Sequence, residues 1–249
     1  MTGGGRGIGA AVARALATAG AKVVVAARTP EEIEGLARAI TAGGGQALAA
    51  VCDVAEEASV RALGDFARAE LGAVDVLVNN AGGASSAPFR RITLEDWNRV
   101  MAVNATGTFL CSREFVPAMV ERGFGRVVNI ASVAGLEGAS YVAHYCAAKH
   151  AVIGLTRALA LELQGTGVTV NAVCPAYVDS PMTERTIENV RSRTGLPREG
   201  ALAAVLASAE QERLVTPEEV AAAVLALCGE EAATSTGRAV VLRPERAKR

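Results

Sequence analysis

The strongest constraint on the fold is the regular alternation of short β-branched runs with longer amphipathic stretches. The runs that predict strands are residues 22–27, 47–52, 74–79, 126–130, 168–173 and 238–242. The stretches that predict helices are residues 8–19, 31–42, 56–71, 94–121, 141–164 and 217–228. Strands that alternate with helices pair in parallel and carry those helices on both faces of the sheet. We therefore expect an α/β fold with a doubly wound parallel sheet, in one domain that spans residues 1–249.

Composition narrows the class of protein. Hydrophobic residues make up 51 % of the chain and charged residues 20 %, which is enough for a large core. The formal net charge of −1 argues against nucleic-acid and membrane-surface partners, because both need a basic face. The cysteines are scattered and form no C-x-x-C pair, so we expect neither a disulfide framework nor a metal site. Reduced thiols, with no apolar stretch long enough for a membrane span, favour a cytoplasmic protein.

A glycine-rich segment opens the chain as Thr2-Gly3-Gly4-Gly5-Arg6-Gly7-Ile8-Gly9 and leads directly into a predicted helix. Glycines let the backbone approach a pyrophosphate, whose charge then lies at the N-terminal end of the helix. A flexible terminus would look similar, but the spacing and the following helix favour a dinucleotide site of the Rossmann type. The expected cofactor-binding residues here are Gly3, Arg6, Gly7, Ile8 and Gly9.

The residue after the strand at 22–27 is expected to meet the adenosine ribose and to select the cofactor. An acid there would bind the ribose hydroxyls of NAD, but this chain has Arg28. A guanidinium suits the 2′-phosphate of NADP, and Arg6 offers a second one. Either arginine could instead be a surface cation, so NAD remains the alternative to NADP.

Tyr145 and Lys149 are four residues apart on a predicted helix and therefore share a face. A nearby ammonium and the positive ring of the cofactor favour the phenolate, so we expect the Tyr145 pKa to lie below its usual value of about 10. Ser132 follows one predicted strand, and Asn80-Ala81-Gly82 follows another. Open α/β sheets bind ligands at the carboxyl ends of their strands, which makes these residues site candidates.

With Asn104 in Val103-Asn104-Ala105-Thr106-Gly107, these motifs follow an order that resembles the short-chain dehydrogenase/reductase family from Thr2 to about Leu242. The resemblance implies that Tyr145 donates a proton and that Ser132 hydrogen-bonds the substrate oxygen. It implies that Lys149 binds the nicotinamide ribose and tunes Tyr145, and that Asn104 holds a water in a proton relay. The further cofactor contacts that it implies are Asp53, Val54, Asn80, Ala81, Gly82, Pro175, the Val178 amide and the Ser180 hydroxyl, besides Tyr145 and Lys149.

Residues 149–182 are similar to ketoreductases that act on 3-oxoacyl thioesters, including those of polyketide synthesis. The resemblance thus implies an NADPH-dependent reductase of such a thioester or a related ketone, assembled as a homo-oligomer and expected to be a tetramer. One alternative is an NAD-dependent alcohol or 3-hydroxyacyl-CoA dehydrogenase. Another is a non-catalytic dinucleotide-binding protein, although such a protein should have lost at least one of Asn104, Ser132, Tyr145 and Lys149.

Several features depart from the family or leave alternatives open. The family's first strand precedes the glycine-rich segment, whereas Met1 directly precedes Thr2, so we expect a truncated strand and a misplaced or shortened start. Ala176 replaces the usual glycine, which costs about 1 kcal/mol if its φ is positive and little otherwise. The irregular residues 181–211 are expected to form a loop that acts as a lid.

Other residues have no fixed role in the sequence. His144 is expected to face away from the Tyr145 side of the helix, because adjacent helical positions point about 100° apart. Tyr141 is expected either to line the substrate pocket or to pack. Leu242-Arg243-Pro244 stands where relatives carry Asp-Gly-Gly, and residues 243–249, with four positive charges, are expected to form a solvated tail.

Overall fold

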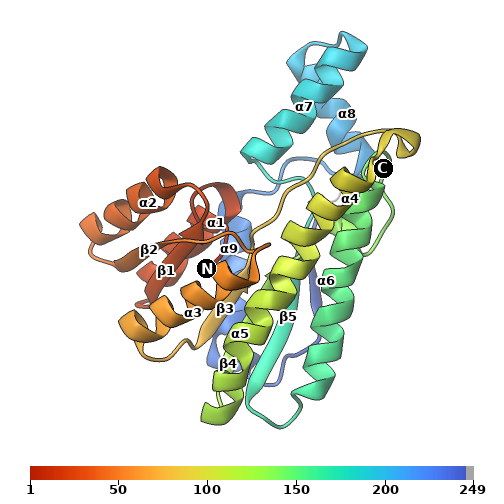
Figure 1. Cartoon of the computed structure of the whole chain (residues 1–249). Coiled ribbons are helices and arrows are strands. Elements are labelled where there is room, and N and C mark those ends of the chain that lie inside the picture. Colours follow the sequence, from red (N-terminus) through yellow and green to blue (C-terminus); the bar gives the residue numbers. More distant parts are fainter. Residues whose placement is uncertain (245–249) are drawn as a thin grey trace.

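The computed structural model describes residues 1–244 as a parallel sheet flanked by two layers of helices (Figure 1). Hydrogen bonds join β1 to β2 and, separately, β3 to β4, β5 and β6 in that order, with every pair parallel. The strands are β1 (Lys22–Ala27), β2 (Gln46–Val51), β3 (Val76–Asn79), β4 (Gly125–Ile130), β5 (Val168–Pro175) and β6 (Ala239–Leu242). The predicted doubly wound α/β fold is confirmed.

Met1 and Thr2 lie between β1 and β3, where the family's first strand is expected. The Ala26 amide donates to the Met1 carbonyl at 2.9 Å, and the Thr2 amide donates to the Val78 carbonyl at 3.0 Å. The Met1 amine donates to the Val24 carbonyl at 3.0 Å. These residues therefore join the two groups of strands through backbone hydrogen bonds.

Successive residues of each central strand pack against opposite helical layers, as the pleat of a strand requires. Val25 and Val128 face the layer that contains α1 (Gly7–Thr18), α2 (Pro30–Ala42) and α9 (Pro217–Cys228). Val24 and Val127 face the layer that contains α3 (Glu57–Leu71), α5 (Gly107–Arg122) and α6 (Ala143–Glu162). In Figure 1, α3, α5 and α6 lie in front of the sheet and α9 lies behind it.

The helix predicted at residues 94–121 is interrupted, so this prediction is wrong in detail. α4 (Leu94–Met101) is followed by a π-helical turn at Ala102–Thr106, and α5 begins at Gly107. The Asn104 side-chain amide donates to the Val100 carbonyl at 2.9 Å, and the Thr108 hydroxyl donates to the Asn104 carbonyl at 2.8 Å. Side-chain donors therefore satisfy carbonyls in and before the wider turn. Such π-turns are frequent at functional sites.

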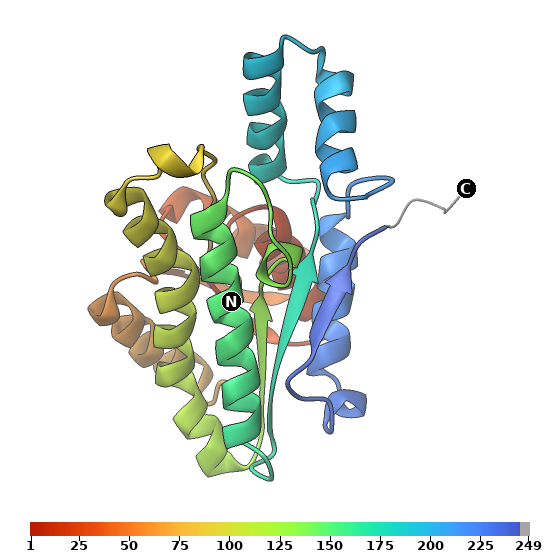
Figure 2. The same cartoon turned by 90° about the vertical axis from the view of Figure 1, so that its right-hand side faces the viewer.

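Residues 181–211 are mostly helical, and the predicted loop is wrong. α7 (Pro181–Thr194) and α8 (Arg198–Ser208) form a hairpin that projects beyond the carboxyl end of β5 (Figure 2). Ser180 caps α7, Pro181 opens it and Gly195 ends it in the left-handed conformation. Ile187 and Val205 are buried between the two helices, which gives the hairpin a small core of its own.

The end of the described chain is not a free tail. Arg243 forms an ion pair with Glu137 at 2.8 Å, and its side chain is only 15 % exposed. The Pro244 carbonyl accepts a hydrogen bond from the Glu212 amide at 2.9 Å. The solvated-tail prediction is thus wrong for Arg243, and residues 245–249 lie outside the described part. Within residues 1–244, no helix is both long and apolar enough to cross a membrane.

Candidate active site

Ser132, Tyr145 and Lys149 meet beyond the carboxyl end of β4. Ser132 follows that strand by two residues, and its hydroxyl hydrogen-bonds the phenol of Tyr145. The same hydroxyl lies 3.3 Å from the Pro175 carbonyl at the end of β5. Tyr145 and Lys149 lie one turn apart on α6, with the Lys149 Nζ 5.6 Å from the centre of the Tyr145 ring. The three predicted catalytic side chains thus form one cluster.

Burial controls the ionisation of this cluster. It raises the pKa of Tyr145 to about 12, although the hydrogen bond with Ser132 acts in the opposite direction. It also lowers the pKa of Lys149 to about 8. The expected lowering of the Tyr145 pKa is therefore not found in the chain itself, because desolvation of the phenolate outweighs its stabilisation. Tyr145 is therefore protonated at neutral pH.

Lys149 is fixed by the backbone of the strand beside it. Its Nζ donates to the Ile130 carbonyl at 2.9 Å, and only 4 % of the residue is exposed. A methyl group on Gly82 would lie 3.5 Å from this Nζ and 2.7 Å from the Asn104 Oδ1. Gly82 therefore lies beside both predicted catalytic residues, which places Asn104 next to the cluster.

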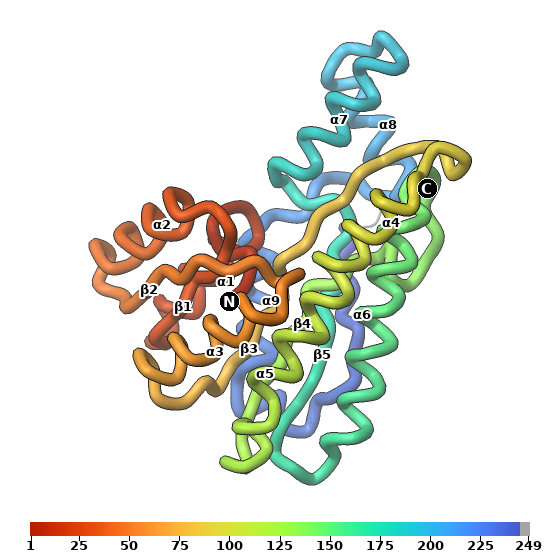
Figure 3. Tube along the Cα trace, viewed as in Figure 1, coloured from red at the N-terminus to blue at the C-terminus, as the bar shows by residue number. Residues whose placement is uncertain are grey.

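Asn104 anchors the segment that leaves β3. Its side-chain amide donates to the Gly83 carbonyl at 2.8 Å, and its Oδ1 accepts from the Gly83 amide at 3.3 Å. Figure 3 shows this segment rising from the end of β3 to α4. The Asn104 side chain thus has a positioning role that the sequence did not indicate.

The glycine-rich segment is bound to the end of β3 by Asn80 and Thr2. The Asn80 amide group donates to the Thr2 and Gly3 carbonyls at 3.1 and 2.9 Å. The Thr2 hydroxyl accepts from the backbone amides of Asn80 and Ala81, each at 3.1 Å. A methyl group on Gly9 would lie 2.2 Å from the Gly3 carbonyl oxygen, so this position requires glycine. Thr2 lies within the motif, but its residue type did not indicate this role.

The N-terminus of α1 offers amides to a ligand. Gly7, with a φ of +52°, begins the helix. The first backbone hydrogen bond of the helix runs from the Ala10 amide to the Arg6 carbonyl, at 3.3 Å. The amides of the residues before Ala10 lie at the N-terminal end of the helix, and the Arg6 side chain does not cap them. A methyl group on Gly7 would approach only Ser180 and Pro181, both at 3.8 Å. The predicted pyrophosphate and nicotinamide segments therefore face one another.

The two arginines predicted to select the cofactor each contact a carboxylate. Arg28 lies 3.7 Å from Asp53, whose other oxygen accepts from the Ala55 amide at 3.0 Å. Arg6 lies 3.1 Å from Glu32 at the start of α2. Both guanidiniums remain exposed, at 71 % for Arg28 and 59 % for Arg6. Val54, the neighbour of Asp53, is buried.

The predicted nicotinamide segment is held by a parallel bridge between Val178 and Val215. The Val215 amide donates to the Tyr177 carbonyl, and the Asp179 amide donates to the Val215 carbonyl, each at 2.9 Å. Because alternate residues of a paired segment point to opposite sides, the Val178 amide points away from Val215. The Ser180 hydroxyl caps α7 by accepting from the Thr183 amide at 3.4 Å. Ala176 does not have a positive φ, so the replacement of glycine there carries little strain.

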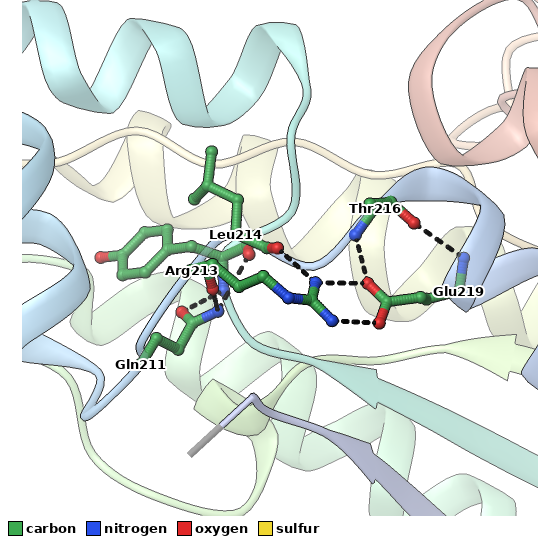
Figure 4. Close-up of polar contacts among 6 residues, drawn as sticks. Gln211, Arg213, Leu214, Thr216 and Glu219 are labelled. Atoms are coloured by element: carbon green, nitrogen blue, oxygen red, sulfur yellow. Dashed lines mark hydrogen bonds and ion pairs between the residues drawn. The ribbon is translucent and has the colours of Figure 1, made fainter. Parts of the chain in front are cut away.

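Gln211 ties this segment to the base of the α7–α8 hairpin (Figure 4). Its Oε1 accepts from the Tyr177 amide at 2.8 Å, and its Nε2 donates to the Tyr177 and Arg213 carbonyls at 3.1 Å each. Arg213 in turn forms two hydrogen bonds with Glu219, which closes a capping box with Thr216 at the start of α9. Gln211 is fully buried, which its residue type does not suggest.

His144 lies in the first turn of α6, and Tyr141 lies just before this helix. The His144 Nε2 lies 2.9 Å from the Ser85 hydroxyl, and burial lowers the pKa of this histidine. It therefore contacts the segment after β3, in line with the expectation that it faces away from Tyr145. Tyr141 is 60 % exposed and has a φ of +67°, so it does not pack in the core.

These features fit a dinucleotide. The glycine-rich segment, the helix N-terminus and the exposed arginines line one side, while Ser132, Tyr145 and Lys149 lie beyond the neighbouring strand ends. Among residues 1–244, no group of three or more histidine, cysteine, aspartate or glutamate side chains is arranged to hold a metal ion.

Comparisons with known proteins agree with this geometry. Residues 1–191 match the family model described as short chain dehydrogenase. A Streptomyces violaceoruber protein described as a ketoacyl reductase of the granaticin polyketide synthase is 39 % identical over 96 % of this chain and 89 % of its own. The D-beta-hydroxybutyrate dehydrogenase of Rhizobium meliloti is 35 % identical over 95 % and 93 %. A crystal structure of an actinorhodin polyketide ketoreductase variant with NADPH is 38 % identical and has a TM-score of 0.93. The match covers 97 % of this chain and 94 % of the ketoreductase chain. The chain is therefore a member of the short-chain dehydrogenase family.

Proposed function

We propose that the protein is an NADPH-dependent reductase that converts a ketone, in particular a 3-oxoacyl thioester or a related compound, to the secondary alcohol. The observation that carries this proposal is the Ser132–Tyr145–Lys149 cluster, with Tyr145 protonated at neutral pH. The NADPH of the actinorhodin ketoreductase structure and the ketoacyl reductases among the relatives support the cofactor and the substrate class.

The bound dinucleotide supplies the hydride, and the side chains of the chain position the carbonyl and supply the proton. Ser132 donates a hydrogen bond to the carbonyl oxygen, which stabilises the negative charge that develops there. Tyr145 gives its proton to the same oxygen. Lys149 holds the nicotinamide ribose and keeps a positive charge near the phenol. Asn104 fixes the segment after β3 and would hold a water that returns a proton to Tyr145.

The cofactor-binding residues in this proposal are those that surround the glycine-rich segment and the strand ends. Gly3, Gly7, Ile8 and Gly9 hold the pyrophosphate, while Arg6 and Arg28 bind the 2′-phosphate. Asp53 and Val54 meet the adenine, and Asn80, Ala81 and Gly82 meet the ribose side. Pro175, Val178 and Ser180 hold the nicotinamide, with the Val178 amide directed away from Val215.

The Tyr145→Phe variant tests the mechanism. Its ring still packs, so NADPH should bind as in the parent, whereas turnover should fall about 10²–10⁴-fold, the usual contribution of general acid catalysis. The measurement is NADPH oxidation with a panel of ketones and acyl thioesters, alongside a fluorescence titration of NADPH. A Tyr145→Phe variant that retains more than about a tenth of the parental rate would contradict the mechanism.

Two further variants separate the roles. Ser132→Ala should chiefly lower kcat, because it removes one donor to the developing oxyanion. Lys149→Ala should weaken NADPH binding and lower kcat together, because its ammonium serves both the ribose and the phenol. Equal affinities of the parent for NADPH and NADH would contradict the cofactor assignment.

We also propose that the protein forms a homotetramer and acts in the cytoplasm. Phe109 on α5 and Leu161 on α6 are exposed apolar side chains, 44 % and 68 % accessible, on helices of one layer. They suit a contact between copies of the chain. All five cysteines are free thiols, which suits a reducing compartment.

A further inference from the structure

Glu32 lies against the glycine-rich segment. It belongs to the first turn of α2, and its Oε1 lies 3.1 Å from the Arg6 Nη1. A methyl group placed on Gly5 would lie 2.8 Å from the Glu32 Cβ and 2.9 Å from its Oε2. The carboxylate therefore occupies the space between Gly5 and the guanidinium of Arg6. Only 33 % of its side chain is exposed.

This position has an electrostatic consequence for the 2′-phosphate. Arg6 and Arg28 bring two positive charges to the adenosine end of the site, and Glu32 and Asp53 bring two negative ones. The phosphate carries a charge of about −1.5 to −2 at neutral pH, and a carboxylate already paired with the guanidinium weakens its attraction. Asp53 is distant from its arginine at 3.7 Å and is also bonded to the Ala55 amide. Glu32 is thus the closer competitor.

We propose that Glu32 is a cofactor-selectivity residue: its carboxylate competes with the 2′-phosphate for Arg6 and so limits the preference for NADPH over NADH. NADPH binding brings the 2′-phosphate to the Arg6–Glu32 pair, so that phosphate and carboxylate compete for one guanidinium and two anions lie side by side. NADH has a ribose hydroxyl at this position, and its binding leaves the ion pair intact. This inference rests on the proposed placement of the 2′-phosphate beside Arg6.

The test is the Glu32→Gln variant, which keeps the size and the contact with Gly5 but removes the charge. The dissociation constants of NADPH and NADH are measured by fluorescence titration. We expect the ratio of the NADH constant to the NADPH constant to rise roughly three- to tenfold, the effect of removing one partly exposed charge. The difference from the parent should shrink near 1 M salt, where the screening length is about 3 Å.

The matched control is Glu34→Gln, which removes the same charge from the same helix. Glu34 pairs with Arg38 at 3.5 Å, and its side chain is 56 % exposed. This variant should leave the ratio unchanged. A smaller probe isolates the subsite: Glu32→Gln should bind adenosine 2′,5′-bisphosphate more tightly than the parent does and adenosine 5′-monophosphate equally well.

An unchanged ratio in Glu32→Gln, or an equal change in Glu34→Gln, overturns the inference. Failure of the proposed reductase function has a different signature, because no ketone or thioester would then be turned over by the parent. A shift of the binding ratio in such a protein would still support the role of Glu32. The binding measurements therefore decide the inference independently of turnover.

Discussion

At the scale of single residues, burial shapes the chemistry of the site more than neighbouring charges do. Tyr145 is held in its protonated form, and Lys149 is brought close to the point where it loses its proton. Both shifts arise because the charged form of a side chain loses hydration when it enters the protein. A cluster whose sequence predicts an activated phenolate thus keeps Tyr145 protonated in the chain itself.

The Lys149 shift predicts a pH dependence. Burial lowers the pKa of this ammonium from 10.5 to about 8, so its charge is present below pH 8 and is lost as the pH rises through that value. If the charge holds the cofactor, kcat/KM for NADPH should fall above about pH 8. In Lys149→Arg the charge persists to higher pH, so the fall should move upward. A fall near pH 8 that is identical in parent and variant would exclude Lys149 as its source.

At the scale of elements, Gln211 anchors both the α7–α8 hairpin and the segment proposed to hold the nicotinamide. The Gln211 side chain bonds both the amide and the carbonyl of Tyr177. The residues just before and just after the hairpin are therefore joined to each other at its base. Because the amide is fully buried, its loss would leave the Tyr177 amide without this acceptor. The anchor can therefore influence the conformation of the segment that starts at Val178.

We predict that Gln211→Leu lowers the free energy of unfolding by about 1–3 kcal/mol, the usual cost of an unsatisfied buried polar group. It should also weaken NADPH binding without changing the affinity for adenosine 2′,5′-bisphosphate, because only the nicotinamide end is disturbed. Urea unfolding and cofactor titration measure the two effects. Gln164→Leu, at an exposed amide, is the control and should change the stability by less than about 0.5 kcal/mol. Equal losses in both variants would refute the role of Gln211.

At the scale of the whole molecule, the two helical layers differ in what they expose. The layer with α5 and α6 presents Phe109 and Leu161, and the hairpin presents Leu196, which is 41 % exposed. Apolar side chains that lie on adjacent long helices suit an extended contact between subunits. A single apolar residue at the tip of a hairpin needs no such explanation.

We predict that light scattering at micromolar protein concentration gives the mass of a tetramer for the parent. The double variant Phe109→Glu, Leu161→Glu should give smaller species, because burying a carboxylate in an apolar contact is costly. Leu196→Glu is the matched control and should remain tetrameric. A monomeric parent, or a double variant that assembles as the parent does, would disprove this contact.

The sequence by itself determined the strand and helix order and the candidate residues at the strand ends. These depend on local regularities: the alternation of β-branched and amphipathic runs, the i, i+4 spacing of Tyr145 and Lys149, and the glycines before α1. The polar stretch after Ser180 led us to expect a loop, whereas the structure has Ser180 capping α7 there.

Only the tertiary structure decided what depends on segments distant in the sequence. The pKa shifts of Tyr145 and Lys149 require the surrounding strands, and the Asn104 side chain bonds the Gly83 carbonyl, 21 positions away. The contacts between Arg6 and Glu32 and between Tyr177 and Gln211 join residues 26 and 34 positions apart. Such pairs leave no periodic pattern in the sequence, because their partners are chosen by the packing of whole elements.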